Sequence, residues 1–130
     1  MTRREAREQA FMVLFEKIFD NDATIFEIVA TAKEAELIKI NSFAETILTA
    51  VEENSVEIDE VIEANSRDWT IARLPKVSLA ILRLAVAEIK YIKDVPNGVA
   101  VNEAVELAKK YGTIEDASFI NGILGTIEKA

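Results

Sequence analysis

The chain contains no cysteine and no histidine. Without cysteine it can form no disulfide and carry out no thiol chemistry. Without histidine it lacks the commonest metal ligand and the commonest general base. Glycine-rich phosphate loops, a nucleophile elbow and metal-ligand spacings are also missing from the sequence. We therefore expect a protein that is not an enzyme and that holds no metal and no cofactor.

Long apolar runs are absent as well. No run approaches the roughly 20 apolar residues that a membrane-spanning helix requires. The N-terminus, MTRREAREQA, is charged and leads into an amphipathic pattern, without the apolar run and cleavage site of a signal peptide. These features predict a cytoplasmic protein that does not contact a membrane. Half of the 130 residues are hydrophobic, which is enough for one compact domain with a sizeable core.

The sequence has no segments that alternate with period two and no internal repeats, whereas helical patterns follow one another along it. The expected fold is all-α, with about seven helices in one compact domain. Capping boxes are predicted to open the first three helices, at Thr2 with Glu5, Thr24 with Glu27, and Ser42 with Glu45. The predicted helices cover residues 3–19, 24–36, 42–54, 76–92, 99–111 and 115–128, and a further helix begins at Ser55.

The segment KVSLAILRLAVAEIKYI, residues 76–92, is the most apolar of these helices. At about 100° per residue, Lys76, Arg83 and Lys90 fall on one narrow stripe and apolar side chains take most of the remaining circumference. This pattern predicts a core helix with a solvent-facing cationic seam. Glu88 projects on the apolar side, where a carboxylate needs a partner. We expect it to accept hydrogen bonds from a neighbouring helix N-terminus or an arginine, so that Glu88→Gln lowers the melting temperature.

Three arginines crowd into the first seven residues. The net charge of −8 argues against a general binder of polyanions, so any nucleic-acid site should be small and local. Arg3, Arg4 and Arg7 oppose the helix dipole at a cost of roughly 0.3–1 kcal/mol each. Two explanations remain open. Arg4 pairs with Glu8 at i,i+4, or an anionic ligand binds at the helix N-terminus.

Phe119, in the segment SFINGIL, also has two interpretations. It shares an apolar face with Ile123 and Ile127, which is typical of a core position. If its ring instead reaches the surface near the arginines, it offers a stacking platform for the unstacked bases of a single-stranded nucleic acid.

Four blocks of the sequence, in this order and at these spacings, resemble the NusB family of bacterial transcription antitermination factors. They are RREAREQAFMVLF, LPKVSLAILRLAVAEI, DVPNGVAVNEAVELAKKYG and SFINGIL. The resemblance extends over essentially the whole chain. It implies two small helical bundles packed together, in a single RNA-binding domain over residues 1–130.

The resemblance further implies that the protein binds the boxA element of ribosomal-operon RNA together with the small-subunit ribosomal protein NusE. That complex would join the elongating RNA polymerase and suppress premature termination. The family's RNA-binding segment corresponds to Arg3, Arg4 and Arg7, with Glu5 where some members carry a further arginine. Phe119 matches the aromatic that approaches RNA. Reversal of the three arginines to Glu is expected to abolish boxA binding and leave the circular dichroism melt nearly unchanged.

The NusE contact of the family corresponds to Phe15 on the first helix and to the Ser78 region at the start of the central helix. Ser78 is neutral where some members carry an acidic residue. Lys76, at the end of the cationic seam near this surface, is a further RNA-binding candidate. A monomer and a homodimer both fit the sequence.

Two other functions fit the same features. One is a helical protein–protein adaptor whose arginines are only paired within the helix. The other is a stand-alone relative of the N-terminal RNA-binding domain of an rRNA cytosine methyltransferase, although such an enzyme needs a nucleotide-binding α/β domain, for which these residues show no pattern. Comparing boxA RNA with scrambled RNA, with and without NusE, separates the adaptor from the RNA-binding protein.

Overall fold

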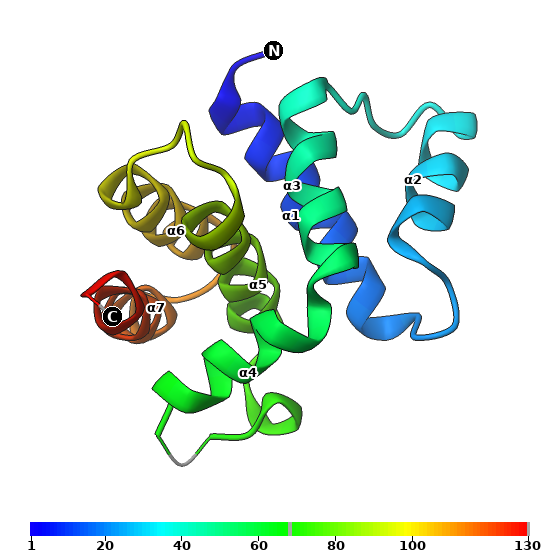
Figure 1. The fold of residues 1–130 in the computed structure, drawn as a ribbon. Helices are drawn as coiled ribbons and strands as arrows, with labels where there is room; N and C mark the ends of the chain where they lie inside the picture. The colour runs from blue at the N-terminus through cyan, green and yellow to red at the C-terminus, as the bar shows by residue number, and fades with distance from the viewer. Residues whose placement is uncertain (68, 130) are drawn as a thin grey trace.

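The structure is a computed structural model that describes residues 1–67 and 69–129, and the elements in these residues are all helical. The prediction of an all-α fold is confirmed. Seven α-helices and one 3-10 turn are described, and Figure 1 shows their arrangement. Their bounds are α1 Arg3–Phe19, α2 Ile25–Glu34, α3 Ser42–Glu53, α4 Ser55–Asn65, η1 Ile71–Arg73, α5 Lys76–Tyr91, α6 Asn97–Tyr111 and α7 Ile114–Lys129.

Helix α5 is the centre of the fold. It packs against α1, α3, α4, α6 and α7, and α2 lies on the outer side of α1. The side chains of Ile81, Leu82 and Leu84 are fully buried, and burial of each such side chain contributes about 1.5–3 kcal/mol. Helices α1 to α3 form one bundle and helices α4 to α7 form the other (Figure 1). Helix α5 belongs to the second bundle and also packs against α1 and α3 of the first. None of the helices in the described part of the chain is long and apolar enough to span a membrane.

The local capping signals fix most of the helix starts. At α1, Glu5 N–H donates to Thr2 Oγ1 (3.1 Å) and Thr2 N–H donates to Glu5 Oε1 (3.0 Å), as predicted. The equivalent box opens α2. The cap predicted at Ser42 is wrong by one residue, because Asn41 Oδ1 accepts the hydrogen bond from Ala44 N–H at 2.9 Å.

The cationic seam of α5 is only partly solvated. Arg83 Nε and Nη2 donate to Asp59 Oδ1 and Oδ2 at 2.9 and 3.0 Å, so this arginine joins α5 to α4. Lys76 and Lys90, at the two ends of the helix, are exposed. The expected solvent-facing seam is therefore interrupted at its middle by an ion pair between helices.

Candidate nucleic-acid interface

A buried ion pair joins α1 to the central helix. Arg7 Nε donates to both carboxylate oxygens of Glu88, at 2.9 and 3.0 Å, and Arg7 Nη2 donates to Oε1 at 2.8 Å. The two side chains are 4% and 0% exposed. Burial raises the pKa of Glu88, and the hydrogen bonds and charge of Arg7 oppose the rise. The prediction that Glu88 points inward is confirmed, and of the two donors expected, a helix N-terminus or an arginine, the arginine is the one present.

Because of this ion pair, Arg7 is buried, whereas an RNA-binding residue was expected to be exposed. Its guanidinium is enclosed and already bonded to a carboxylate, so a phosphate does not reach it in this arrangement. The expectation that reversing all three arginines leaves the melt unchanged is wrong for the same reason. A glutamate at position 7 would place a second buried carboxylate against Glu88, which costs several kcal/mol.

Arg3 and Arg4, in contrast, are 51% and 63% exposed. Arg3 Nη2 lies 2.8 Å from Asp94 Oδ2 on the α5–α6 turn, and this hydrogen bond lowers the pKa of Asp94. Arg4 Nε and Nη2 donate to the two oxygens of Glu103 on α6, at 3.1 and 3.2 Å, and these bonds raise the pKa of Arg4. Of the two explanations left open for the arginines, the pairing of Arg4 with Glu8 within α1 is therefore not the one observed.

Phe43 on α3 positions two of the arginines. The Cζ atoms of Arg3 and Arg7 lie 4.3 and 5.0 Å from the centre of its ring. A cation at this distance is attracted by the electron-rich ring face. The exposed Arg3 is therefore held between the Phe43 ring and Asp94. Arg7, one turn further along α1, holds this helix against α5 through its ion pair with Glu88.

Glu8 takes part in a separate contact with α6. It accepts from Lys110 Nζ at 2.6 Å and from the Tyr111 hydroxyl at 2.7 Å, and these two bonds lower its pKa. Burial raises the pKa of Tyr111, whose ring stacks on Phe11 at 4.9 Å. A cleft of about 210 Å³ lies between α1 and α6 here, lined by Arg4, Arg7, Glu8, Glu103, Glu106, Leu107 and Lys110.

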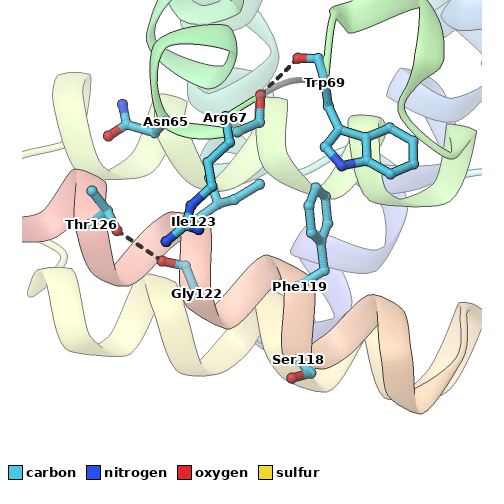
Figure 2. Close-up of a pocket in the computed structure, with 9 residues that line it drawn as sticks. Asn65, Arg67, Trp69, Ser118, Phe119, Gly122, Ile123 and Thr126 are labelled. Atoms are coloured by element: carbon cyan, nitrogen blue, oxygen red, sulfur yellow. Dashed lines mark hydrogen bonds between the residues drawn. The ribbon is translucent and has the colours of Figure 1, made fainter.

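Phe119 lies in a different place, in a cleft of about 390 Å³ between the end of α4 and α7. Figure 2 shows this cleft, which is lined by Asn65, Ser66, Arg67, Trp69, Ser118, Phe119, Gly122, Ile123 and Thr126. Its lining shares no residue with that of the cleft beside the arginines. Of the two interpretations of Phe119, a ring beside the arginines is therefore not supported, since Phe119 and the arginines line different clefts. The ring is half-buried, packing on the core and also facing the cleft.

Trp69 is the residue that the sequence reasoning missed. Its ring makes an edge-to-face contact with Phe119, with centroids 6.2 Å apart and an interplanar angle of 65°. Trp69 is the one tryptophan of the chain and follows directly on the polar segment at the end of α4. A lone tryptophan in a connecting segment is a signal that could have marked this position, since loops carry binding residues disproportionately often.

The two expected partner-binding residues differ in accessibility. Phe15 is half-buried in a row of rings on α1, 5.9 Å from Phe11 and 5.1 Å from Phe19. Ser78 is fully buried, and its hydroxyl donates to Asp116 Oδ1 of α7 at 3.3 Å. A direct partner contact by Ser78 is not supported, because its side chain has no exposed surface.

The fold and these surfaces define a small helical protein that presents arginine and aromatic side chains from a rigid core. The chain is 43% identical to the transcription antitermination protein NusB of Natranaerobius thermophilus over 131 residues, covering 98% of this chain and 94% of that protein. It is also 43% identical to the NusB protein of Listeria monocytogenes over 127 residues, covering 98% and 96%.

Solved structures give the same result. T. maritima NusB superposes with a TM-score of 0.87 at 32% identity, covering 99% of this chain and 92% of that one. A crystal structure of the antitermination factors NusB and NusE in complex with dsRNA contains a chain with a TM-score of 0.85 at 30% identity, covering 99% and 98%. Residues 4–129 match the NusB family model. The chain belongs to the NusB family.

Proposed function

We propose that this chain is a transcription antitermination factor that binds boxA RNA together with NusE and so joins the elongating RNA polymerase. Family membership supports this function, and a structural relative occurs in a complex with NusE and RNA. The proposal gives the chain a single RNA-binding domain that acts in the cytoplasm, by binding and not by catalysis. The observation that carries it is the pair of exposed guanidinium groups of Arg3 and Arg4 on an anchored helix end.

In this mechanism Arg3 and Arg4 exchange their carboxylate partners for RNA phosphates. Guanidinium groups bind phosphate through two parallel hydrogen bonds, as they bind carboxylate. Arg7 does not contact RNA in the present arrangement and acts as a positioning residue, since its bond to Glu88 holds the first turns of α1 against α5. Two phosphate contacts give a modest salt dependence, with a slope of about −1.4 in a plot of log K against log salt.

Such a small site binds RNA weakly on its own, which fits a protein that needs NusE to extend the surface. We place the NusE contact on the Phe15 side of α1 and at the start of α5, where Lys76 is exposed. Ser78 contributes indirectly, because its bond to Asp116 holds the start of α5 against α7. Lys76, which is exposed at the start of α5 beside the proposed NusE contact, stays an RNA-binding candidate.

The test is the double reversal Arg3→Glu/Arg4→Glu, with Arg7 left in place. The matched control is Lys33→Glu/Lys39→Glu, which gives the same net charge on an exposed surface near the end of α2. We expect the double reversal to lower the affinity for labelled boxA RNA at least about tenfold, and the control to leave it nearly unchanged. Both variants should keep the wild-type melt. Equal RNA affinity in the two variants would overturn this assignment of the arginines.

One observation favours the protein–protein adaptor as a second function. Each of the three arginines already has a carboxylate partner from α5, α6 or the turn between them. In an adaptor these pairs are purely structural. Equal affinity for boxA and scrambled RNA, with and without NusE, would support that function.

A further inference from the structure

Phe43 is the second residue of α3, a helix that packs along α1 and also against α5 (Figure 1). Its side chain is half-buried and packs against the hydrophobic core, so the position of the ring is fixed by its own neighbours. The Cζ atoms of Arg3 and Arg7 lie 4.3 and 5.0 Å from the ring centre. One ring therefore contacts both the exposed Arg3 and the buried Arg7.

The two arginines beside Phe43 differ in how firmly their other contacts hold them. Arg7 is fixed by three hydrogen bonds to Glu88, a carboxylate with no exposed surface. Arg3 is 51% exposed and its carboxylate partner Asp94 is 67% exposed. Exposed ion pairs of this kind contribute little, because water screens the charges and both side chains lose freedom. The Phe43 ring is thus the contact that joins Arg3 to a rigid part of the protein.

The ring and the carboxylate contact different parts of the Arg3 guanidinium. A guanidinium stacks on an aromatic ring through its flat face, whereas its N–H donors point outward in the plane of the group. Asp94 accepts from one of these donors, Nη2, at 2.8 Å. A phosphate binds the same N–H donors. The contact with Phe43 can therefore persist while a phosphate takes the place of Asp94.

Arg4 provides a contrast on the same helix. Its Nε and Nη2 donate to Glu103 at 3.1 and 3.2 Å, and these are N–H groups that a phosphate would take. Among the described residues, the cation–ring contacts are those of Arg3, Arg7 and Lys110. The contacts that hold Arg4 are therefore lost when a phosphate replaces the carboxylate, whereas Arg3 keeps its contact with the ring.

We propose that Phe43 is a positioning residue of the RNA-binding site, which holds the Arg3 guanidinium with its N–H edge open to a phosphate and does not itself contact the RNA. This proposal rests on the proposed function. Because the ring restricts the Arg3 side chain before the RNA arrives, less conformational freedom is lost on binding. A residue of α3 thereby contributes to the affinity of a site formed by α1.

The first test compares variants of the ring by fluorescence anisotropy, with labelled single-stranded boxA RNA, NusE present and the salt concentration fixed. We expect Phe43→Leu to lower RNA affinity about two- to fivefold, the strength of an exposed cation–ring contact. Phe43→Tyr keeps the ring and should restore most of the affinity. The matched control is Phe26→Leu, the same change at an exposed ring of α2. Wild-type affinity in Phe43→Leu would overturn this proposal and leave the proposed function intact, whereas absence of binding by the wild type would overturn both.

The second test separates positioning of Arg3 from loss of packing around the ring. Phe43→Leu is introduced into an Arg3→Gln background, which has no guanidinium to position. If Phe43 acts through Arg3, the ring substitution should change RNA affinity in this background by less than about 1.5-fold. A loss of affinity by the same factor in both backgrounds would overturn the proposal, because the ring would then act independently of Arg3.

A third measurement does not depend on how well the leucine variant folds. Pentafluorophenylalanine in place of Phe43 keeps the shape of the ring and removes the negative charge from its face, which is the part that attracts a cation. We expect this variant to lower RNA affinity as Phe43→Leu does, while its melt stays near that of the wild type. Wild-type affinity in the fluorinated protein would show that the ring does not hold Arg3 through its charge distribution, which overturns the proposal.

Discussion

The arginine cluster at the start of α1 and the cleft between α4 and α7 present cations in opposite ways. Arg3, Arg4 and Arg7 are each bonded to a carboxylate before any ligand arrives. Arg67 instead projects over a cleft from a strained backbone, beside exposed aromatic surface. An anion at the first region must displace a carboxylate, which reduces the net free energy of its binding. The comparison therefore shows one region whose arginines are held by carboxylates and another whose arginine lies beside exposed aromatic surface.

The largest difference between the arginine cluster and the α4–α7 cleft is expected in stability, and Arg7→Met tests it. Removing this cation leaves Glu88 charged and buried without a partner, which costs about 3–5 kcal/mol of unfolding free energy. The same substitution in the other region, Arg67→Met, removes an exposed cation and should change stability by less than about 0.5 kcal/mol. Urea denaturation of the two variants measures the difference.

A double variant, Arg7→Met/Glu88→Leu, distinguishes the charge effect from loss of packing. Replacing both partners of a buried pair by apolar residues is often neutral or stabilising. The double variant should therefore recover most of the stability that Arg7→Met loses. If it is as unstable as the single variant, packing around the Arg7 side chain, and not the unpaired carboxylate, is the main contribution.

The second effect concerns the strain at Arg67. Glycine adopts φ near 54° without the steric cost that other residues incur. We expect Arg67→Gly to raise the unfolding free energy by up to about 1 kcal/mol. Arg67→Gln, which keeps a side chain and the left-handed backbone, should leave the unfolding free energy nearly unchanged. A loss of stability in Arg67→Gly would show that the left-handed backbone is held by the side chain itself.

The features that could be predicted from the sequence are those that depend on residues close together in the chain. The boxes at Thr2 and Thr24 rest on contacts three residues apart, and both are present. The need of Glu88 for a partner followed from its position on an apolar face. That the partner is Arg7, 81 residues earlier, was beyond local reasoning, because it depends on how α1 crosses α5.

The errors have the same origin. Glu8 was one partner considered for Arg4 because a sequence shows only neighbours a few residues apart, whereas the fold brings Glu103 of α6 against Arg4. The contact between Trp69 and Phe119 likewise joins two segments 50 residues apart, and no periodicity predicts it. One local signal was overlooked, the capping box of Thr113 with Asp116 at the start of α7.

A smaller effect tests whether carboxylates restrain the arginine cluster. Asp94→Asn frees Arg3 from an exposed ion pair, which is worth at most about 1 kcal/mol. We expect RNA affinity to rise by up to about fivefold, with the melt nearly unchanged. Asp22→Asn, an exposed change of the same charge on the α1–α2 turn, is the control and should have little effect. Equal increases in both variants would mean that net charge alone is responsible.

The smallest effect is the pH dependence of the Glu8 contact. Lys110 and Tyr111 lower the pKa of Glu8 below its ordinary value of 4.5, so folding is favoured where Glu8 is ionised in both states. This contribution is present above pH 4.5 and is lost as the pH falls through the lowered pKa. Because the contact lies near the surface, it amounts to less than about 1 kcal/mol.

Glu8→Gln should therefore melt a few degrees below the wild type at pH 7, and the gap should close as the pH falls below 4.5. Glu16→Gln changes an exposed carboxylate on the same helix and should show no such gap at either pH. A gap for Glu8→Gln that persists in acid would mean that the hydrogen bonds to α6, and not the charge of Glu8, hold this end of α1.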